Sequence, residues 1–214
     1  MTPPPRLLAL LGDSILDNAR YTHPEPGTTG HLQSMLGAAW TVELAAQDGA
    51  TIDLLPPQLE LLSRRPELAI LSVGGNDAIG YLDILAPRRT TTTQMLTLLE
   101  NIVDDFEEAY RGALVDVMTR TERLVVCTIY EPPMANDEMA RLVRVPLSLF
   151  NDRIIQVASR LGVDILDLRS VCTLPSDFVQ EIEPSARGGR KIAEAIAAVV
   201  QGSGPGQASR VHVR

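Results

Sequence analysis

A serine, a glycine and an asparagine stand directly after three successive apolar runs of the sequence. Ser14 lies in GDS after the first run, Gly49 follows the second run in DGAT, and Asn76 lies in GGND after the third. A serine at a strand-to-helix turn can expose its hydroxyl to a carbonyl carbon. A glycine N–H and an asparagine side chain can donate hydrogen bonds to the oxyanion that such an attack creates. Together these residues predict acyl-transfer chemistry.

Each of these segments also has a purely structural interpretation. Asp13 and Ser14 are residue types favoured at helix N-caps, and Gly-Asn-Asp and Asp-Gly are common turn sequences. GDS alone therefore leaves a capping role for Ser14 as open as a nucleophilic one. Asp13 and Asp77, which flank Ser14 and Asn76, are expected to support the site.

Five short apolar runs, each followed by a turn or helix signal, predict five strands. The runs are almost continuously apolar, as is typical of strands that helices cover on both faces of a parallel sheet. They lie at residues 7–11, 42–46, 68–73, 124–129 and 163–166.

Segments of helical period alternate with these runs. In the clearest, 94–119, apolar residues recur at spacings of three and four. The other predicted helices cover 30–36, 53–63, 147–161 and 187–200. This alternation predicts an α/β fold, a three-layer α/β/α sandwich around a parallel sheet. Ligands bind beyond the carboxyl ends of the strands in such sheets, so Ser14, Gly49 and Asn76 are expected to converge there.

With these segments in this order, the chain resembles the SGNH/GDSL hydrolase superfamily over nearly its whole length. Ser14 matches the family's nucleophilic serine, Gly49 its oxyanion glycine, and Asn76, within the G-x-N-D pattern, its oxyanion asparagine. The resemblance implies a five-stranded, flavodoxin-like sheet. It also implies a serine esterase or deacylase that uses no metal or organic cofactor.

The last block of the chain departs from the family pattern. The family reads D-x-x-H-P-S before a glycine and an Ile-Ala pair, whereas this chain reads QEIEPSARG before its own Ile-Ala pair. This register places Glu183 where the family has its catalytic histidine and Gln180 where it has the aspartate. The form I-E-P-S-A-x-G-G resembles that of a bacterial subgroup of the superfamily.

A glutamate at this position can still accept the proton of Ser14. Its reference pKa of about 4.3 makes it a weaker base than a histidine, at about 6.5, unless burial raises that pKa. Gln180 cannot orient the base as a charged partner. Glu181 or Asp177 could do so, although both are expected at the surface.

The histidines are the alternative bases. His23 lies in a proline-rich loop after Ser14 that could fold over the pocket, so it stays open as a replacement for Glu183. His31 is expected on a helix, as a surface or core residue, and His212 lies in the C-terminal tail. The segment YEPP at 130–133 follows the fourth strand, where it could line the pocket or only stiffen a loop.

Composition argues against several other classes of protein. The formal net charge of −8 disfavours a nucleic-acid partner, and the basic residues Arg187, Arg190 and Lys191 alternate with glutamates as on a solvated face. The first apolar run is too short to span a bilayer and has no export signal, so we expect a cytoplasmic protein without a membrane partner. Cys127 and Cys172 are then expected to be reduced, and neither has metal-ligand spacing.

The first hypothesis is a hydrolase of small esters. Ser14 attacks the carbonyl, the N–H groups of Gly49 and Ser14 and the side chain of Asn76 hold the oxyanion, and Glu183 is the base. Because the His-Asp pair is replaced, a weakly active protein that binds a carboxylate or acyl ligand, and an acyltransferase, remain alternatives. A single domain is expected at 6–201, between mobile tails at 1–5 and 202–214, and the oligomeric state is not determined.

Overall fold

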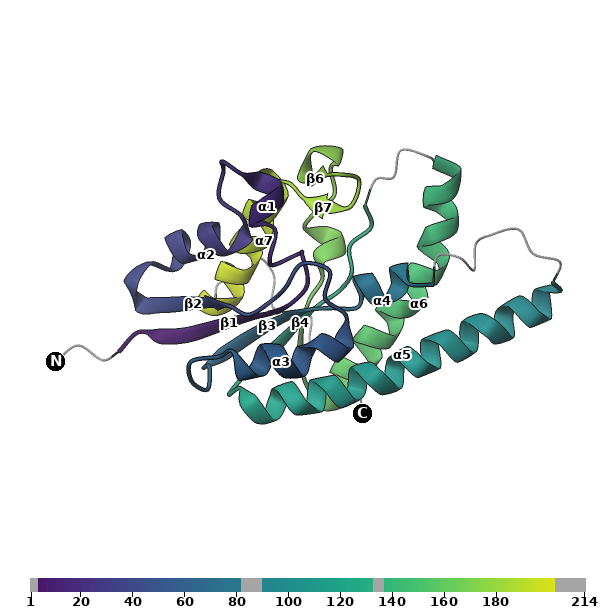
Figure 1. Ribbon diagram of the computed structural model, residues 1–214, viewed down its shortest axis with the longest axis horizontal. Coiled ribbons are helices and arrows are strands. Elements are labelled where there is room, and N and C mark those ends of the chain that lie inside the picture. The colour runs from purple at the N-terminus through teal and green to yellow at the C-terminus, as the bar shows by residue number, and fades with distance from the viewer. Residues whose placement is uncertain (1–3, 82–89, 133–136, 203–214) are drawn as a thin grey trace.

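A five-stranded parallel sheet lies at the centre of the protein (Figure 1). The structure, a computed structural model, describes residues 4–81, 90–132 and 137–202. The strands are β1 (Arg6–Gly12), β2 (Trp40–Leu44), β3 (Leu68–Ser72), β4 (Leu124–Cys127) and β5 (Asp164–Leu166). Their order, β2-β1-β3-β4-β5, confirms the predicted flavodoxin-like sheet. In this order the topological switch point lies between β1 and β3, the strands that precede Ser14 and Asn76.

Helices cover both faces of this sheet. They are α1 (Ala19–Thr22), α2 (Thr28–Leu36), α3 (Leu55–Glu60), α4 (Gly75–Ile79), α5 (Thr92–Arg120), α6 (Asp137–Leu161) and α7 (Ala186–Gln201). Helices α2 and α7 lie on one face, and α3, α5 and α6 lie on the other (Figure 1). Along β1, Leu8 and Leu10 join the core beneath α2 and α7, whereas Ala9 and Leu11 join the opposite core. This two-residue alternation is why the run had to be apolar throughout.

Four short elements carry no sequence signal, because each is too short to show a period. They are α1, α4, and an antiparallel pair of strands, β6 (Phe178–Val179) and β7 (Glu183–Pro184). Helix α6 begins at Asp137 and runs through Pro146, whereas the sequence predicts a start at residue 147. A proline removes one helical hydrogen bond, but the helix can resume on either side of it.

The prediction that Asp177 lies at the surface is wrong. Its side chain is fully buried, where it accepts hydrogen bonds from the N–H groups of Thr173 and Leu174 and pairs with Lys191 at 2.6 Å. Burial alone would raise the pKa of Asp177, but Lys191 and these N–H groups lower it below its ordinary value. Lys191 therefore anchors α7 to the preceding loop and is not part of a solvated face.

Cys127 and Cys172 are free and buried, as the sequence predicts. No helix in the described part of the chain is long and apolar enough to cross a bilayer. Most of both predicted tails, residues 1–3 and 203–214 with His212, lies outside the described residues.

Candidate active site

The turn that presents Ser14 depends on Gly12. Gly12 has a φ of +115°, and a Cβ atom there would lie 1.7 Å from the carbonyl oxygen of Ser72 on β3. The side chain of Gln58 holds the same residue from α3, because Gly12 N–H donates to its Oε1 at 2.7 Å and its Nε2 donates to the Gly12 oxygen at 2.8 Å. Sequence analysis missed Gln58, whose only signal was a place between Leu55 and Leu59 on the inward face of a helix.

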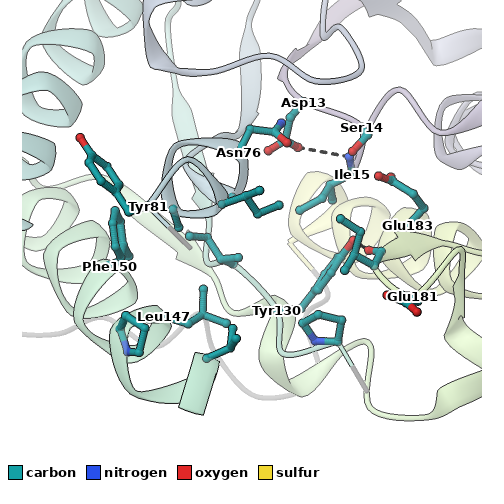
Figure 2. Close-up of a pocket in the computed structure, with 18 of the residues that line it drawn as sticks. Asp13, Ser14, Ile15, Asn76, Tyr81, Tyr130, Leu147, Phe150, Glu181 and Glu183 are labelled. Atoms are coloured by element: carbon teal, nitrogen blue, oxygen red, sulfur yellow. Dashed lines mark hydrogen bonds between the residues drawn. The ribbon is translucent and has the colours of Figure 1, made fainter. Parts of the chain in front are cut away.

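No helix begins at this turn, so Ser14 is not an N-cap, and the side chain of Asp13 stabilises the turn. The N–H of Ile15 donates to Asp13 Oδ1 at 3.1 Å (Figure 2). The Ser14 side chain is 8% exposed and lines a pocket at the carboxyl edge of the sheet. Its hydroxyl is thus shielded from bulk water but faces a space that a substrate can enter.

Asn76 lies across the switch point from Ser14, in the first turn of α4, and lines the same pocket. One N–H of its side-chain amide donates to the carbonyl oxygen of Ala50 at 2.9 Å, which leaves the second N–H for a ligand. Gly49 directly precedes Ala50 and has a φ of +80°, but it is not among the residues that line the pocket. Asp77 supports this contact, since its Oδ1 accepts the N–H of Ile52 at 3.3 Å.

Glu183 lies on β7 with its carboxylate toward Ser14 (Figure 2). Burial raises the pKa of Glu183 above its ordinary value, and an interaction with the Ser14 side chain lowers it in part. The negative charge of Asp48 raises this pKa further, whereas the positive charge of Arg20 lowers it. Oε2 of Glu183 is buried and has no hydrogen-bond partner among the described residues. An unpaired, partly desolvated carboxylate is a stronger base than a solvated one.

Two contacts hold the segment that carries Glu183. The hydroxyl of Tyr130 donates to the carbonyl oxygen of Ile182 at 2.5 Å. The side-chain amide of Asn18 donates to the carbonyl oxygen of Pro184 at 3.1 Å. Tyr130 and Pro132 line the pocket, so part of the segment 130–133 does form its wall, while residue 133 lies outside the described residues. Asn18 was missed by sequence analysis because nothing local marks its distant partner.

Asp13 is a second carboxyl group in the pocket wall, and it is almost fully buried. Burial raises the pKa of Asp13 to about 7. Hydrogen bonds from Ile15 N–H and the Ser72 hydroxyl act in the opposite direction, and the negative charges of Glu183 and Asp77 raise this pKa further. Asp13 can consequently keep its proton at pH values where an exposed carboxyl group has lost it.

The histidines weighed as bases lie outside the pocket. His23 is exposed, His31 is half-buried on α2, and neither lines the pocket. Gln180 and Glu181 form the exposed tip between β6 and β7, with φ angles of 47° and 72°, and of these two only Glu181 lines the pocket. Within the described ranges, no cluster of three histidine, cysteine or acidic side chains could hold a metal ion.

The fold and this site together define a class of protein. A five-stranded sheet of this order, with a GDS serine at the carboxyl end of β1 and a GGND asparagine after β3, is the architecture of SGNH hydrolases. The chain belongs to the GDSL-like Lipase/Acylhydrolase family, whose model matches residues 10–191. No curated protein matches the sequence.

Solved structures with the same fold include esterases. LAE5, an alpha/beta hydrolase enzyme from the metagenome of Lake Arreo, Spain, is 16% identical with a TM-score of 0.66, over 94% of this chain and 97% of that one. Axe2, an acetylxylan esterase from Geobacillus stearothermophilus, is 18% identical with a TM-score of 0.62, over 97% of each chain. Catalytic mutants of Axe2 replace a serine, an aspartate or a histidine by alanine. The family and these structures together support a hydrolase.

Proposed function

We propose that this protein is a serine esterase or deacylase in which Glu183 replaces the histidine as base. The observation that carries the proposal is a half-buried carboxylate beside Ser14, whose Oε2 is buried and has no hydrogen-bond partner within the described chain. Its raised pKa brings the base closer to neutral pH, where proton transfer from a serine is more effective. Membership in an acylhydrolase family and the likeness to Axe2 support ester hydrolysis as the reaction.

The reaction proceeds in two halves. Glu183 takes the proton of the Ser14 hydroxyl while the oxygen attacks the ester carbonyl. The N–H groups of Ser14 and Gly49 and the free N–H of Asn76 hold the resulting oxyanion. When the tetrahedral intermediate collapses, the C–O bond to the alcohol breaks, Glu183 returns the proton to the leaving oxygen, and an acyl-Ser14 ester remains. Water then attacks this ester while Glu183 takes one of its protons. When the second intermediate collapses, the C–O bond to Ser14 breaks, Glu183 returns the proton to the serine oxygen, and the acid leaves.

The segment around Glu183 holds the carboxylate near Ser14. Catalytic hydrogen bonds are often long in the absence of substrate and tighten when it binds. Tyr130 and Asn18 donate to the carbonyl oxygens of the residues before and after Glu183, which limits how far the carboxylate can move.

The direct test is covalent labelling of Ser14 by a fluorophosphonate probe. We expect mass spectrometry to place the adduct on Ser14, and we expect the Ser14→Ala variant to remain unlabelled while keeping its thermal unfolding temperature. Hydrolysis of p-nitrophenyl acetate should disappear in the same variant. A protein that binds acyl ligands without turning them over would give neither labelling nor Ser14-dependent hydrolysis, and this result would contradict the proposal.

A further inference from the structure

The pocket beside Ser14 is polar at one end and apolar along the rest of its length. It has a volume of about 290 Å³. Asp13, Ser14, Asn76 and Glu183 gather at one end, and Tyr81, Phe150 and Leu147 lie at the other (Figure 2). Aliphatic and aromatic side chains from α4, α5, α6 and the segment after β4 form most of the wall. These side chains include Ala78, Ile79, Leu99, Ile102, Ile129 and Phe150.

The surroundings of Glu183 differ on the side away from this pocket. Asp48 accepts hydrogen bonds from Arg20 and Tyr21, both at 2.8 Å. Arg20 and Asp48 are close enough to Glu183 to change its pKa, but none of the three residues of this polar cluster lines the pocket. Glu183 therefore stands between an apolar pocket and a polar, partly exposed cluster.

The two halves of an ester differ in the same way. The acyl chain of a fatty ester is apolar, whereas an alcohol that carries hydroxyl or charged groups needs polar partners or water. An acetyl group would occupy only the polar end of the pocket and leave the wall of α4, α5 and α6 in contact with water. A longer chain would bury that wall, and burial of apolar surface is favourable.

We propose that the substrate of this site is an ester of a medium-length, unbranched aliphatic acid such as octanoic acid, with the acyl chain along the apolar pocket and the alcohol beside Arg20, Tyr21 and Asp48. This inference rests on the proposed function, since it assumes that Ser14 attacks the ester. It separates this chain from an enzyme that removes acetyl groups, the activity of the structural neighbour Axe2.

A series of p-nitrophenyl esters tests the acyl half, because the leaving group stays constant while the acid lengthens from acetate to octanoate. Each methylene that moves from water into an apolar pocket can raise kcat/KM up to about fourfold. We expect octanoate to exceed acetate by about a hundredfold or more. Highest kcat/KM on acetate, with a steady fall as the acid lengthens, would overturn the proposal.

A second series assigns the pocket to one half of the ester. Alkyl acetates from ethyl to octyl keep the acid constant and lengthen the alcohol. We expect kcat/KM to change little along this series, because the alcohol faces the polar cluster. If it rises along the alkyl acetates and not along the p-nitrophenyl esters, the pocket binds the alcohol and the proposal is wrong.

The Ala78→Leu variant narrows the pocket from α4 and should lower the ratio of octanoate to acetate kcat/KM by about tenfold or more. Ala109→Leu makes the same exchange on an exposed position of α5 and should leave this ratio unchanged. An unaltered ratio in a folded Ala78→Leu protein would contradict the proposal, and if this variant does not fold, the two ester series on the wild type still decide. Ester hydrolysis that persists in Ser14→Ala would instead refute the proposed function.

Discussion

The side-chain amide of Asn18 joins the loop after Ser14 to the strand that carries Glu183. Its Nδ2 donates to the carbonyl oxygen of Pro184 at 3.1 Å, and its Oδ1 accepts the N–H of Thr28 at 2.7 Å. Asn18 is fully buried, so water cannot replace either bond. One amide thus fixes the separation of a serine and a carboxylate that lie near opposite ends of the chain.

The Asn18→Ala variant should lose activity beyond its loss of stability. It leaves the Pro184 oxygen and the Thr28 N–H without partners, and each buried group left unpaired costs about 1–3 kcal/mol. Because the strand of Glu183 is released, we expect kcat to fall by about tenfold or more while KM changes little.

Gln33→Ala is the matched control for this variant. Gln33 bridges the backbone at Trp40 and Val42, far from the pocket, so its loss should lower the free energy of unfolding without a selective effect on kcat. Urea unfolding and steady-state kinetics on both variants provide the comparison. If Asn18→Ala and Gln33→Ala are equally destabilised and have the same kcat, Asn18 is purely structural.

Glu183→Gln removes the base while keeping the shape of the side chain. We expect kcat/KM for an activated ester to fall by about 10²–10⁴-fold. The wild-type rate should rise with pH through the apparent pKa of the Glu183 carboxylate, because only its ionised form accepts a proton. Burial places this ascending limb above the ordinary value of 4.5. Glu108→Gln, at an exposed position of α5 outside the pocket, should keep both the rate and the pH profile.

The Glu183→His variant tests whether the pocket retains the geometry of its family. An imidazole should be tolerated, and the ascending limb should move toward the reference pKa of a histidine, about 6.5. If Glu183→Gln is as active as the wild type while His23→Ala is inactive, the loop histidine is the base instead. That outcome would require the exposed loop of His23 to close over the pocket.

Asn76→Ala should lower kcat/KM by about 10²–10³-fold through the loss of an oxyanion donor. The exchange also removes the hydrogen bond to the Ala50 oxygen, so a shift of the neighbouring Gly49 can contribute to the loss of rate. Circular dichroism and thermal unfolding should therefore accompany the kinetics. Asn101→Ala, on an exposed part of α5, serves as the control and should have the wild-type rate. A wild-type rate in Asn76→Ala would remove this residue from the mechanism.

Asp13 should make the stability of the fold depend on pH. Its pKa is about 7 in the folded protein, against an ordinary value of 3.8. Between these values the folded state holds a proton that the unfolded chain has released, so the free energy of unfolding falls as pH rises toward 7 and stays lower above it.

The Asp13→Asn variant lacks this titration and still offers an oxygen to the Ile15 N–H. Its stability relative to the wild type should therefore increase with pH, and the gain should be larger at about pH 8 than at about pH 5 by more than about 1 kcal/mol. Urea unfolding at both pH values measures the difference. Parallel pH dependence in the two proteins would mean that Asp13 does not titrate in this range.

The sequence by itself determined the sheet and the residues at its active edge. Strands that are covered on both faces must be apolar at every position, so runs such as 7–11 and 68–73 could be recognised without knowledge of their partners. Parallel strands that alternate with helices end at one edge of the sheet, which brings Ser14 and Asn76 together in any such fold. The register of the last block likewise singled out Glu183.

Only the tertiary structure decided which groups support Ser14, Asn76 and Glu183 and what kind of pocket lies beside them. Gln58 clamps Gly12, Asn18 holds Pro184, and Asp177 is buried beneath Lys191, and all three contacts join segments that are not neighbours in sequence. The pKa values of Asp13 and Glu183 are set by burial, which depends on packing from several elements at once. The apolar pocket likewise belongs to no single segment, because three helices and the segment after β4 form its wall and meet only in the folded chain.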